Sequence, residues 1–496
     1  MLWYDCPNEP KTSLPDCYKP ARWGLPAQAV AGLGGRLAGL SDHYRACFVT
    51  KTRDVNEHAS TYLRGQLTMD AKRNFANVDR RVTGGDGQAI QHFMSKSPWS
   101  GQAVFAQIQA DIRATPELAQ GGWLILDESA DEKAGLHSAG AGRQHNGRLG
   151  KIGVCQVATC LTYSHPALGV WTLIDGELFL PQAWFSAEYA ELREQVELPA
   201  EREFATKPTL GLRMILRVTA AGVPFERVTC DELYGRNQAF RATLDAESIG
   251  YAAQVPANTL VYEEEPRVGL PRRRRRQGQR PKRLKVLSQK APREARALAH
   301  SRKTLWRQVR VRATERGGLE AEFAVQRIWT VASGQPARAE WLVMQREADG
   351  DVAYTLLNAP PDTPEQTLIE WSCQRHVTER TFQDAKDDLG WDEFQAMKYL
   401  AWEHHMALTA LALWFITQTK LEWRTTYARD PELAKELEVE VLPALSTANV
   451  REMLKAALPI PHLTPEEATQ LVVRHLVNRA RSTSSRLEAQ NHRDFD

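Results

Sequence analysis

The chain has 496 residues, 63 Lys and Arg against 61 Asp and Glu, and a formal net charge of +2. Such a length exceeds one ordinary core and predicts about two to four domains. The apolar and charged fractions are those of globular proteins, which excludes wholesale disorder. Because there is no apolar run of about 18 residues and no secretory signal pattern, we expect a cytoplasmic protein with no membrane partner. The seven cysteines are scattered without C-x-x-C spacing, which argues against disulfides or a zinc site.

The first part of the chain has a mainly helical pattern, and we expect a helical N-terminal domain over residues 1–118. The texture changes at GGWLILDES, where four apolar residues precede Asp127. That pattern predicts a buried strand whose last residue, Asp127, emerges at the edge of a sheet. Two strands, a helix and another short strand that ends on Asp231 follow, over residues 152–165, 168–181, 201–221 and 227–231.

The order β–β–β–α–β–α, with strands before helices, predicts an α/β mixed sheet flanked by helices. We expect its first part over residues 119–262 and its second part over 346–430. Strand-like segments between them predict a β-rich insertion over residues 263–345, which carries a basic loop. Helices are predicted over 365–389 and about 393–420, and a helical tail over 431–496.

Two aspartates, Asp127 and Asp231, each end a predicted buried strand. Carboxylates held side by side at one sheet edge repel each other, and a divalent cation between them removes the repulsion. The helix over 365–389 offers a third acid, Glu379. On an ideal helix Arg375, Glu379, Phe382 and Lys386 share one face, because their spacings of four, three and four residues nearly complete whole turns. Glu379 would then hold metal while Arg375 and Lys386 grip a phosphate backbone.

The basic loop has the sequence PRRRRRQGQRPKRLK over residues 271–285, with nine basic side chains and no acid. Cationic density of this kind suits DNA phosphates, because their neutralisation releases condensed counterions. We therefore include Arg272, Arg273, Arg274, Arg275 and Arg276 among the candidate DNA-binding residues. The alternative interpretation is a solvated, flexible loop.

Several blocks in order resemble bacterial insertion-sequence transposases with an Asp-Asp-Glu triad, most nearly the group called insertion-sequence family seven hundred and one. The blocks include LILDESADEKAGLHSAGAGRQHNGRLGKIG, which begins at Leu124, VTCDELYGRN at 228–237 and RHVTERTFQDAKDDLGWDEFQ at 375–395. The resemblance implies a ribonuclease-H-like catalytic domain and assigns Asp127, Asp231 and Glu379 as the triad. A broader, related group has a tyrosine three residues before the arginine, where this chain has Ser372.

The resemblance also implies a mechanism and partners. Two Mg²⁺ ions, which Mn²⁺ can replace, would be shared by the triad about 3.5–4 Å apart and serve DNA hydrolysis and strand transfer. The partners would be double-stranded DNA, namely terminal inverted repeats and target DNA, and a second copy in a homodimeric synaptic complex. The protein would act in the bacterial cytoplasm, on the nucleoid.

Other interpretations stay open at this stage. A domesticated or inactive copy would act as a DNA-binding regulator, and a nuclease would share the site without strand transfer. A basic structural DNA-binding protein would carry the acids incidentally. A glycosidase does not fit the neighbouring acids Asp127 and Glu128, because adjacent side chains on a strand point to opposite faces.

Overall fold

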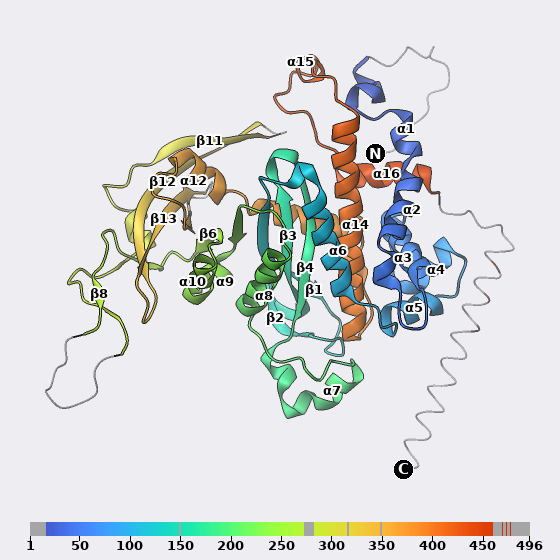
Figure 1. Cartoon of the computed structure of the whole chain (residues 1–496), viewed down its shortest axis with the longest axis horizontal. Helices are drawn as coiled ribbons and strands as arrows, with labels where there is room; N and C mark the ends of the chain where they lie inside the picture. The colour runs from blue at the N-terminus through green and yellow to red at the C-terminus, as the bar shows by residue number, and fades with distance from the viewer. Residues whose placement is uncertain are drawn as a thin grey trace.

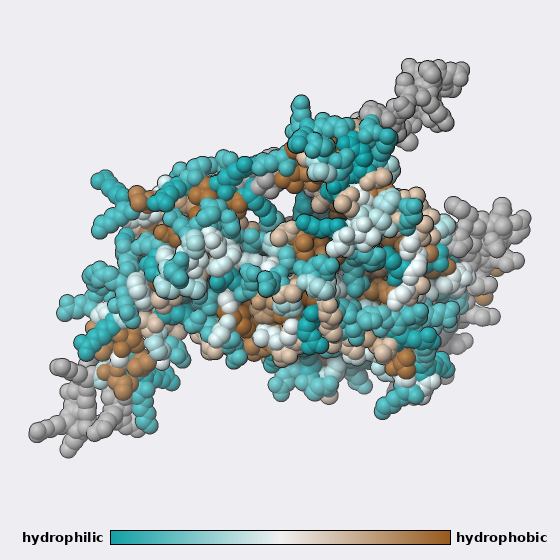
Figure 2. Space-filling view, turned by 45° about the horizontal axis from the view of Figure 1, so that its top comes forward, coloured by the Kyte–Doolittle hydropathy of each residue, from teal (hydrophilic) through white to brown (hydrophobic). Residues whose placement is uncertain are grey.

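A computed structural model describes residues 16–147, 150–271, 282–314, 317–347 and 350–459, together with residues 469, 473 and 477. The arginines expected to contact DNA, Arg272 to Arg276, lie outside the described residues, as does most of the C-terminal tail. No helix in the described part of the chain combines the length and the apolar character needed to cross a bilayer. On the face shown in Figure 2, apolar residues gather in small separate patches within a largely hydrophilic surface.

A ten-stranded sheet forms the centre of the molecule, in the order β11-β12-β13-β14-β6-β5-β1-β3-β2, with β4 also paired to β3. Its strands are β1 (Trp123–Glu132), β2 (Gly142–Asn146), β3 (Lys151–His165), β4 (Val170–Phe179), β5 (Arg227–Cys230), β6 (Gly250–Val255), β11 (Arg307–Thr314), β12 (Gly317–Val331), β13 (Ala337–Arg346) and β14 (Val352–Leu357). Two short two-stranded pairs are separate from this strand order: β7 (Leu260–Val261) with β10 (Arg293–Glu294), and β8 (Val268–Gly269) with β9 (Lys285–Val286).

The strand directions confirm the predicted mixed sheet flanked by helices. Strand β1 runs antiparallel to β3 and parallel to β5, and β5 runs parallel to β6. Helices α8 (Lys207–Ala220) and α10 (Gln238–Ala246) connect these strands, so the chain follows the expected order β–β–β–α–β–α with one additional strand, β2, between the first two predicted strands. The sub-order β4-β3-β1-β5-β6 agrees with a ribonuclease-H-like core. The run Trp123 to Leu126 is buried, as an apolar strand at the centre of a covered sheet must be.

The predicted β-rich insertion extends this same sheet. Strands β11, β12 and β13 continue the sheet through β14 to β6, and in Figure 1 they lie to the left of β1, β3 and β4. Glu340 on β13 is fully buried and accepts a hydrogen bond from the Tyr251 hydroxyl of β6 at 2.6 Å. Its carboxylate also pairs with the buried Arg241 of α10 at 3.3 Å. A buried ion cluster therefore joins the extension to the core.

Helix α14 (Tyr399–Thr426) lies between the sheet and most of the N-terminal helices (Figure 1), whereas α6 (Gly101–Ala114) also packs directly on β4. Helix α14 packs on β4, α6 and α3, and nearly all of its first twenty residues are buried. The remaining helices are α1 (Ala27–Ala31), α2 (Leu33–His43), α3 (Asn56–Thr68), α4 (Phe75–Val82), α5 (Gln88–Ser95), α7 (Ala190–Gln195), α9 (Glu232–Gly235), α11 (Ala295–Ala299), α12 (Glu365–Ser372), α13 (His376–Gln383), α15 (Leu433–Glu436) and α16 (Thr447–Ala457). Helix α14 is buried on nearly all sides and is therefore a core helix, which explains its apolar sequence.

Candidate active site

Asp127 and Asp231 lie at the same level of the sheet. Strands β1 and β5 run parallel with Leu126 beside Cys230, so the next residue of each chain segment is an aspartate. Asp231 follows β5 and caps α9, where its Oδ1 accepts hydrogen bonds from the backbone N–H groups of Leu233 and Tyr234. Its Oδ2 makes no hydrogen bond to any described residue. The cap therefore orients one carboxylate oxygen and leaves the other for a ligand.

The prediction that β1 ends on Asp127 was wrong. The strand continues to Glu132, because every residue from Trp123 to Glu132 stays paired with β3. Asp127 therefore sits inside a strand with its backbone held opposite Cys160, which fixes its position more firmly than a strand end would.

Glu379 lies on α13, but the predicted single helix over 365–389 is interrupted. Helix α12 ends at Ser372, α13 begins at His376, and residues Asp384–Asp388 form a π-helical turn. Even so, Arg375, Glu379, Phe382 and Lys386 line one cleft together with Asp127 and Asp231. This cleft has a volume of about 620 Å³. The structure thus brings together all the predicted site residues that it describes.

Arg375 joins two of the three acids. Its Nη1 lies 3.0 Å from Oδ2 of Asp127, and its Nη2 lies 3.7 Å from Oε1 of Glu379. Burial raises the pKa of Asp127 to about 6; the Arg375 guanidinium opposes this effect and the nearby Asp231 adds to it. The cleft therefore holds a buried carboxylate whose charged form is stabilised by nearby positive charge, and Arg375 supplies part of that charge.

The donor set fits a divalent cation by its chemistry. Three carboxylates are the hard oxygen ligands that Mg²⁺ and Mn²⁺ prefer. No three His, Cys, Asp or Glu side chains among the described residues are close enough together to hold an ion as they stand. Glu379 is the exposed member of the three acids: its side chain is 69% exposed, and its Oε1 lies 3.7 Å from Arg375.

Lys386, the second predicted phosphate ligand, is anchored on the other side of Glu379. Its Nζ donates a hydrogen bond to the Ala130 carbonyl at 2.8 Å and lies 5.7 Å from the centre of the Trp391 ring. The ammonium group therefore stays beside β1 and inside the cleft. Arg375 and Lys386 therefore both contribute positive charge to the cleft that the acids line.

Two further cleft residues were not among the predicted site residues. Glu128 has one oxygen on Lys207 of α8 at 2.7 Å, while its buried Oε1 has no hydrogen-bond partner. Strand alternation correctly places its side chain away from Asp127, but the residue still lines the cleft. His145 lies on β2, a strand that was not predicted from the sequence, and it is exposed at the cleft. Its pairing with Ile152 of β3 is a long-range contact that the local pattern does not reveal.

Comparisons with known proteins agree with this geometry. A family model described as DDE superfamily endonuclease matches residues 43–318, a range that includes Asp127 and Asp231 but ends before Glu379. A relative from Microchaete diplosiphon, described as "Probable transposase for insertion sequence element IS701", is 26% identical over 227 residues. That match covers 44% of this chain and 54% of the relative, so the chain spans about half the length of the relative.

A solved structure with a similar chain is the cryo-EM structure of a piggyBac transposase synaptic complex with hairpin DNA. The identity is 13%, the match covers 90% of this chain and 86% of that chain, and the TM-score is 0.33, which is too low to support any inference about this chain. The family-model match covers more than half of the 496 residues and confirms the resemblance seen in the sequence. The chain therefore belongs to the DDE superfamily endonuclease family.

Proposed function

We propose that the protein is a DNA transposase that cleaves and rejoins DNA at the terminal inverted repeats of an insertion sequence. The observation that carries this proposal is the single cleft in which Asp127, Asp231 and Glu379 meet Arg375 and Lys386. Family membership supports a metal-dependent DNA endonuclease, because DDE superfamily endonucleases generally depend on a divalent metal. The sequence blocks shared with insertion-sequence transposases support strand transfer as well as cleavage.

In this proposal Asp127, Asp231 and Glu379 are the catalytic and metal-holding residues, and Mg²⁺ is the ion, with Mn²⁺ as a substitute. Ions held by these three carboxylates would supply Lewis-acid chemistry for an in-line displacement at phosphorus, at the attacking and the leaving oxygen. The protein contributes positioning. Asp127 is fixed by β-sheet pairing and Asp231 by its helix cap, so both carboxylates are held in place before the substrate arrives.

Arg375 and Lys386 bind the phosphates on either side of the scissile bond. A cation held by Asp127 would compete with Arg375 for that carboxylate and would leave the guanidinium available to a phosphate. The planar guanidinium of Arg375 can donate two parallel hydrogen bonds to two oxygens of one phosphate. Lys386 keeps its place through the Ala130 carbonyl and contributes a second positive charge.

The partners proposed are the terminal inverted repeats, target DNA and a second protomer in a homodimeric synaptic complex. The N-terminal helical domain, residues 1–118, is proposed to recognise the repeats, and the insertion over 263–345 to contact flanking DNA. Domain boundaries at residues 118, 262, 345 and 430 are part of the proposal. Limited proteolysis and footprinting on end DNA test these assignments. Such a protein would act on the nucleoid in the bacterial cytoplasm.

The test is excision of an element from a plasmid that carries the gene's own flanking DNA ends. Wild type is compared with Asp127→Asn, Asp231→Asn and Glu379→Gln, with Mg²⁺ present or chelated. Glu370→Gln, on the neighbouring helix α12 and outside the cleft, is the matched control for loss of one acid. We expect metal-dependent excision in wild type and in the control, and none in the three cleft variants, which still bind the ends.

Each other outcome points to a different protein. Specific binding to the ends without excision by wild type would replace the proposal with a DNA-binding regulator. Cleavage without joining would indicate a nuclease. Excision that persists in Glu379→Gln would show that another acid, such as the neighbouring Asp387 of the same cleft, is the third ligand.

A further inference from the structure

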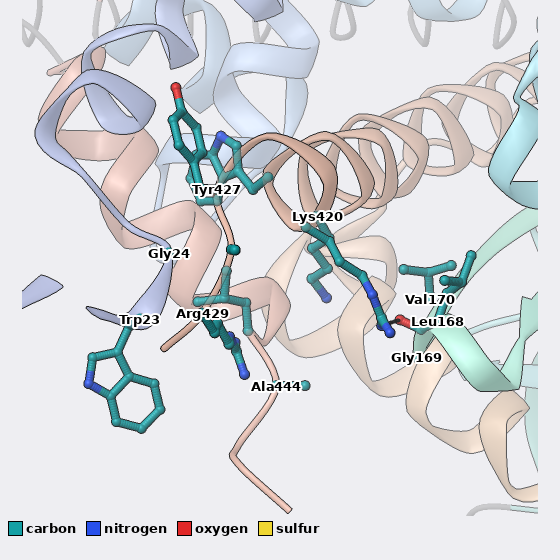
Figure 3. Close-up of a pocket in the computed structure, with 13 residues that line it drawn as sticks. Trp23, Gly24, Leu168, Gly169, Val170, Lys420, Tyr427, Arg429 and Ala444 are labelled. Atoms are coloured by element: carbon teal, nitrogen blue, oxygen red, sulfur yellow. Dashed lines mark hydrogen bonds between the residues drawn. The ribbon is translucent and has the colours of Figure 1, made fainter. Parts of the chain in front are cut away.

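A second cavity, of about 450 Å³, lies at the opposite end of the central sheet from the acid cleft. Its walls come from the C-terminal end of α14, the turn between β3 and β4, the segment at Trp23 and the loop at Ala444 (Figure 3). Cys160 lies beside Asp127, and the turn begins after His165, so the rise of β3 alone separates the two sites by roughly 17 Å. The cavity is therefore distinct from the candidate active site.

The charged residues that line this cavity are all cations: Lys420, Arg424 and Arg429. Among the described residues, no Asp or Glu lines it. A concave site walled by one sign of charge concentrates the potential within it and attracts ligands of the opposite charge. The lining therefore favours an anionic ligand.

Lys420 is the most telling of the three. Its side chain is partly buried, and its ammonium group makes no hydrogen bond or ion pair with any described residue. The group lies 5.3 Å from the centre of the Trp171 ring; burial lowers its pKa, Asp384 and Asp388 oppose that effect, and Arg380 adds to it. A cation that is partly removed from water without a hydrogen-bonded partner carries a desolvation cost, and a bound anion would offset that cost.

Aromatic side chains accompany the cations. Trp23 is half-buried at the edge of the cavity, with the Arg429 guanidinium 5.9 Å from its ring centre. Its indole N–H donates to the Cys17 carbonyl at 2.7 Å, which fixes the ring plane. Trp423 and Tyr427 complete the apolar wall. A cationic groove with interleaved aromatic rings is the arrangement by which proteins hold single-stranded nucleic acid.

A second hollow of about 390 Å³ adjoins the cavity. The two share Trp23, Arg429, Ala444 and Leu445 in their walls, and together we call them the groove. Glu452 lines the far hollow, which confines the purely cationic lining to the first cavity. A chain that threads this groove can place a phosphate in the first cavity and a base on Trp23.

We propose that this groove binds a single strand of DNA outside the catalytic cleft, with a phosphate between Lys420, Arg424 and Arg429 and a base against Trp23. This inference rests on the proposed function, since it takes DNA as the source of the phosphate. The volume of the first cavity falls within the range of about 300–1,000 Å³ that is usual for small-ligand sites, so one nucleotide unit fits.

The experiment measures binding of a 5′-phosphorylated tetrathymidylate with a 3′ fluorescent label to the full-length protein. Lys420→Met, Arg424→Gln and Trp23→Ala are compared with wild type. Lys435→Met is the control, because it removes one exposed cation from the same end of the molecule without touching the cavity. We expect Kd to rise about fivefold or more in Trp23→Ala, as loss of one stacked base predicts. In Lys420→Met and Arg424→Gln the slope of log Kd against log salt should fall by about 0.7.

Three results would overturn the inference. The first is a Kd in all cavity variants equal to that of Lys435→Met. The second is loss of binding in the control as well, which would indicate a general charge effect. The third is competition by free thymidine monophosphate as strong as that by unlabelled tetrathymidylate, which would indicate a mononucleotide site. Arg424 is exposed, so its variant remains a usable test if Lys420→Met does not fold, as judged by near-UV circular dichroism.

Failure of this inference is separable from failure of the proposed function. Asp127→Asn should bind tetrathymidylate as wild type does, because the two sites are distinct. If wild type excises DNA but the cavity variants bind the oligonucleotide normally, only the groove assignment falls. If the cavity variants lose oligonucleotide binding but wild type cuts no DNA, only the proposed function falls.

Discussion

Replacement of Asp127 by asparagine should have two opposite effects. The variant keeps the size and most of the hydrogen-bonding capacity of the side chain but removes its charge. We expect the variant to lose metal-dependent cleavage. In the absence of metal, we expect its free energy of unfolding to be higher than that of wild type. The reason is that Asp127 is a largely buried carboxylate with Asp231 near it and one cation, Arg375, at 3.0 Å.

The magnitude follows from the pKa. Burial raises the pKa of Asp127 from 3.8 to about 6, against the effect of Arg375 and with a contribution from Asp231. A carboxyl whose pKa is raised by folding stabilises the fold fully below its unfolded pKa, and that stabilisation is lost as the pH rises through the folded pKa. At pH 8 the charged group therefore costs the fold about 3 kcal/mol, and Asp127→Asn should recover up to that amount.

Urea unfolding at pH 8 tests both effects, first with a chelator and then with excess Mg²⁺. Wild type should gain stability from Mg²⁺, since a ligand that binds the folded state stabilises it, and Asp127→Asn should gain little. Asp175→Asn is the control: its pKa is also about 6, but Arg217 binds it at 2.8 Å outside the cleft, so it should keep the Mg²⁺ effect. A variant less stable than wild type in chelator, or equally stabilised by Mg²⁺, would refute the reasoning.

Three further predictions concern the scaffold, each read from urea unfolding. Glu340→Gln should destabilise the protein by about 3–5 kcal/mol, because it leaves the buried Arg241 without its anion; a loss under 1 kcal/mol would contradict this. Gly211→Ala should lower the free energy of unfolding by about 1–3 kcal/mol, because the added methyl would press on the buried side chain of Leu126. Gly39→Ala has open space around the added methyl and should raise the free energy of unfolding slightly. His405 accepts from the Tyr62 hydroxyl and donates to the Trp391 carbonyl, and burial lowers its pKa to about 4. The unfolded state takes up the proton at a higher pH than the folded state does. The contribution of His405 to the free energy of unfolding should therefore fall by about 2 kcal/mol between pH 7 and pH 5, and the difference in the free energy of unfolding between wild type and His405→Gln should shrink accordingly.

Much of the core could be predicted from the sequence because its signals are local. The apolar run before Asp127 and the short strand before Asp231 each predict a buried strand, and parallel pairing of two such strands brings the acids together. The spacing of Arg375, Glu379, Phe382 and Lys386 predicted a shared face, and all four do line one cleft. The period of 2 for a strand and of 3.6 for a helix can be recognised from nearby residues alone, so these predictions need no information about distant segments.

Only the tertiary structure decided the rest. Pairing with β3 carries β1 past Asp127 to Glu132, and a break and a π-helical turn divide the predicted helix around Glu379. The insertion strands extend the catalytic sheet, and Arg375 lies between two acids in the absence of metal. The cationic groove at Lys420 draws its walls from four separate segments, at Trp23, Leu168, Lys420 and Ala444, which span most of the chain. Each of these features depends on contacts between segments distant in sequence, whose energies no local pattern of residues contains.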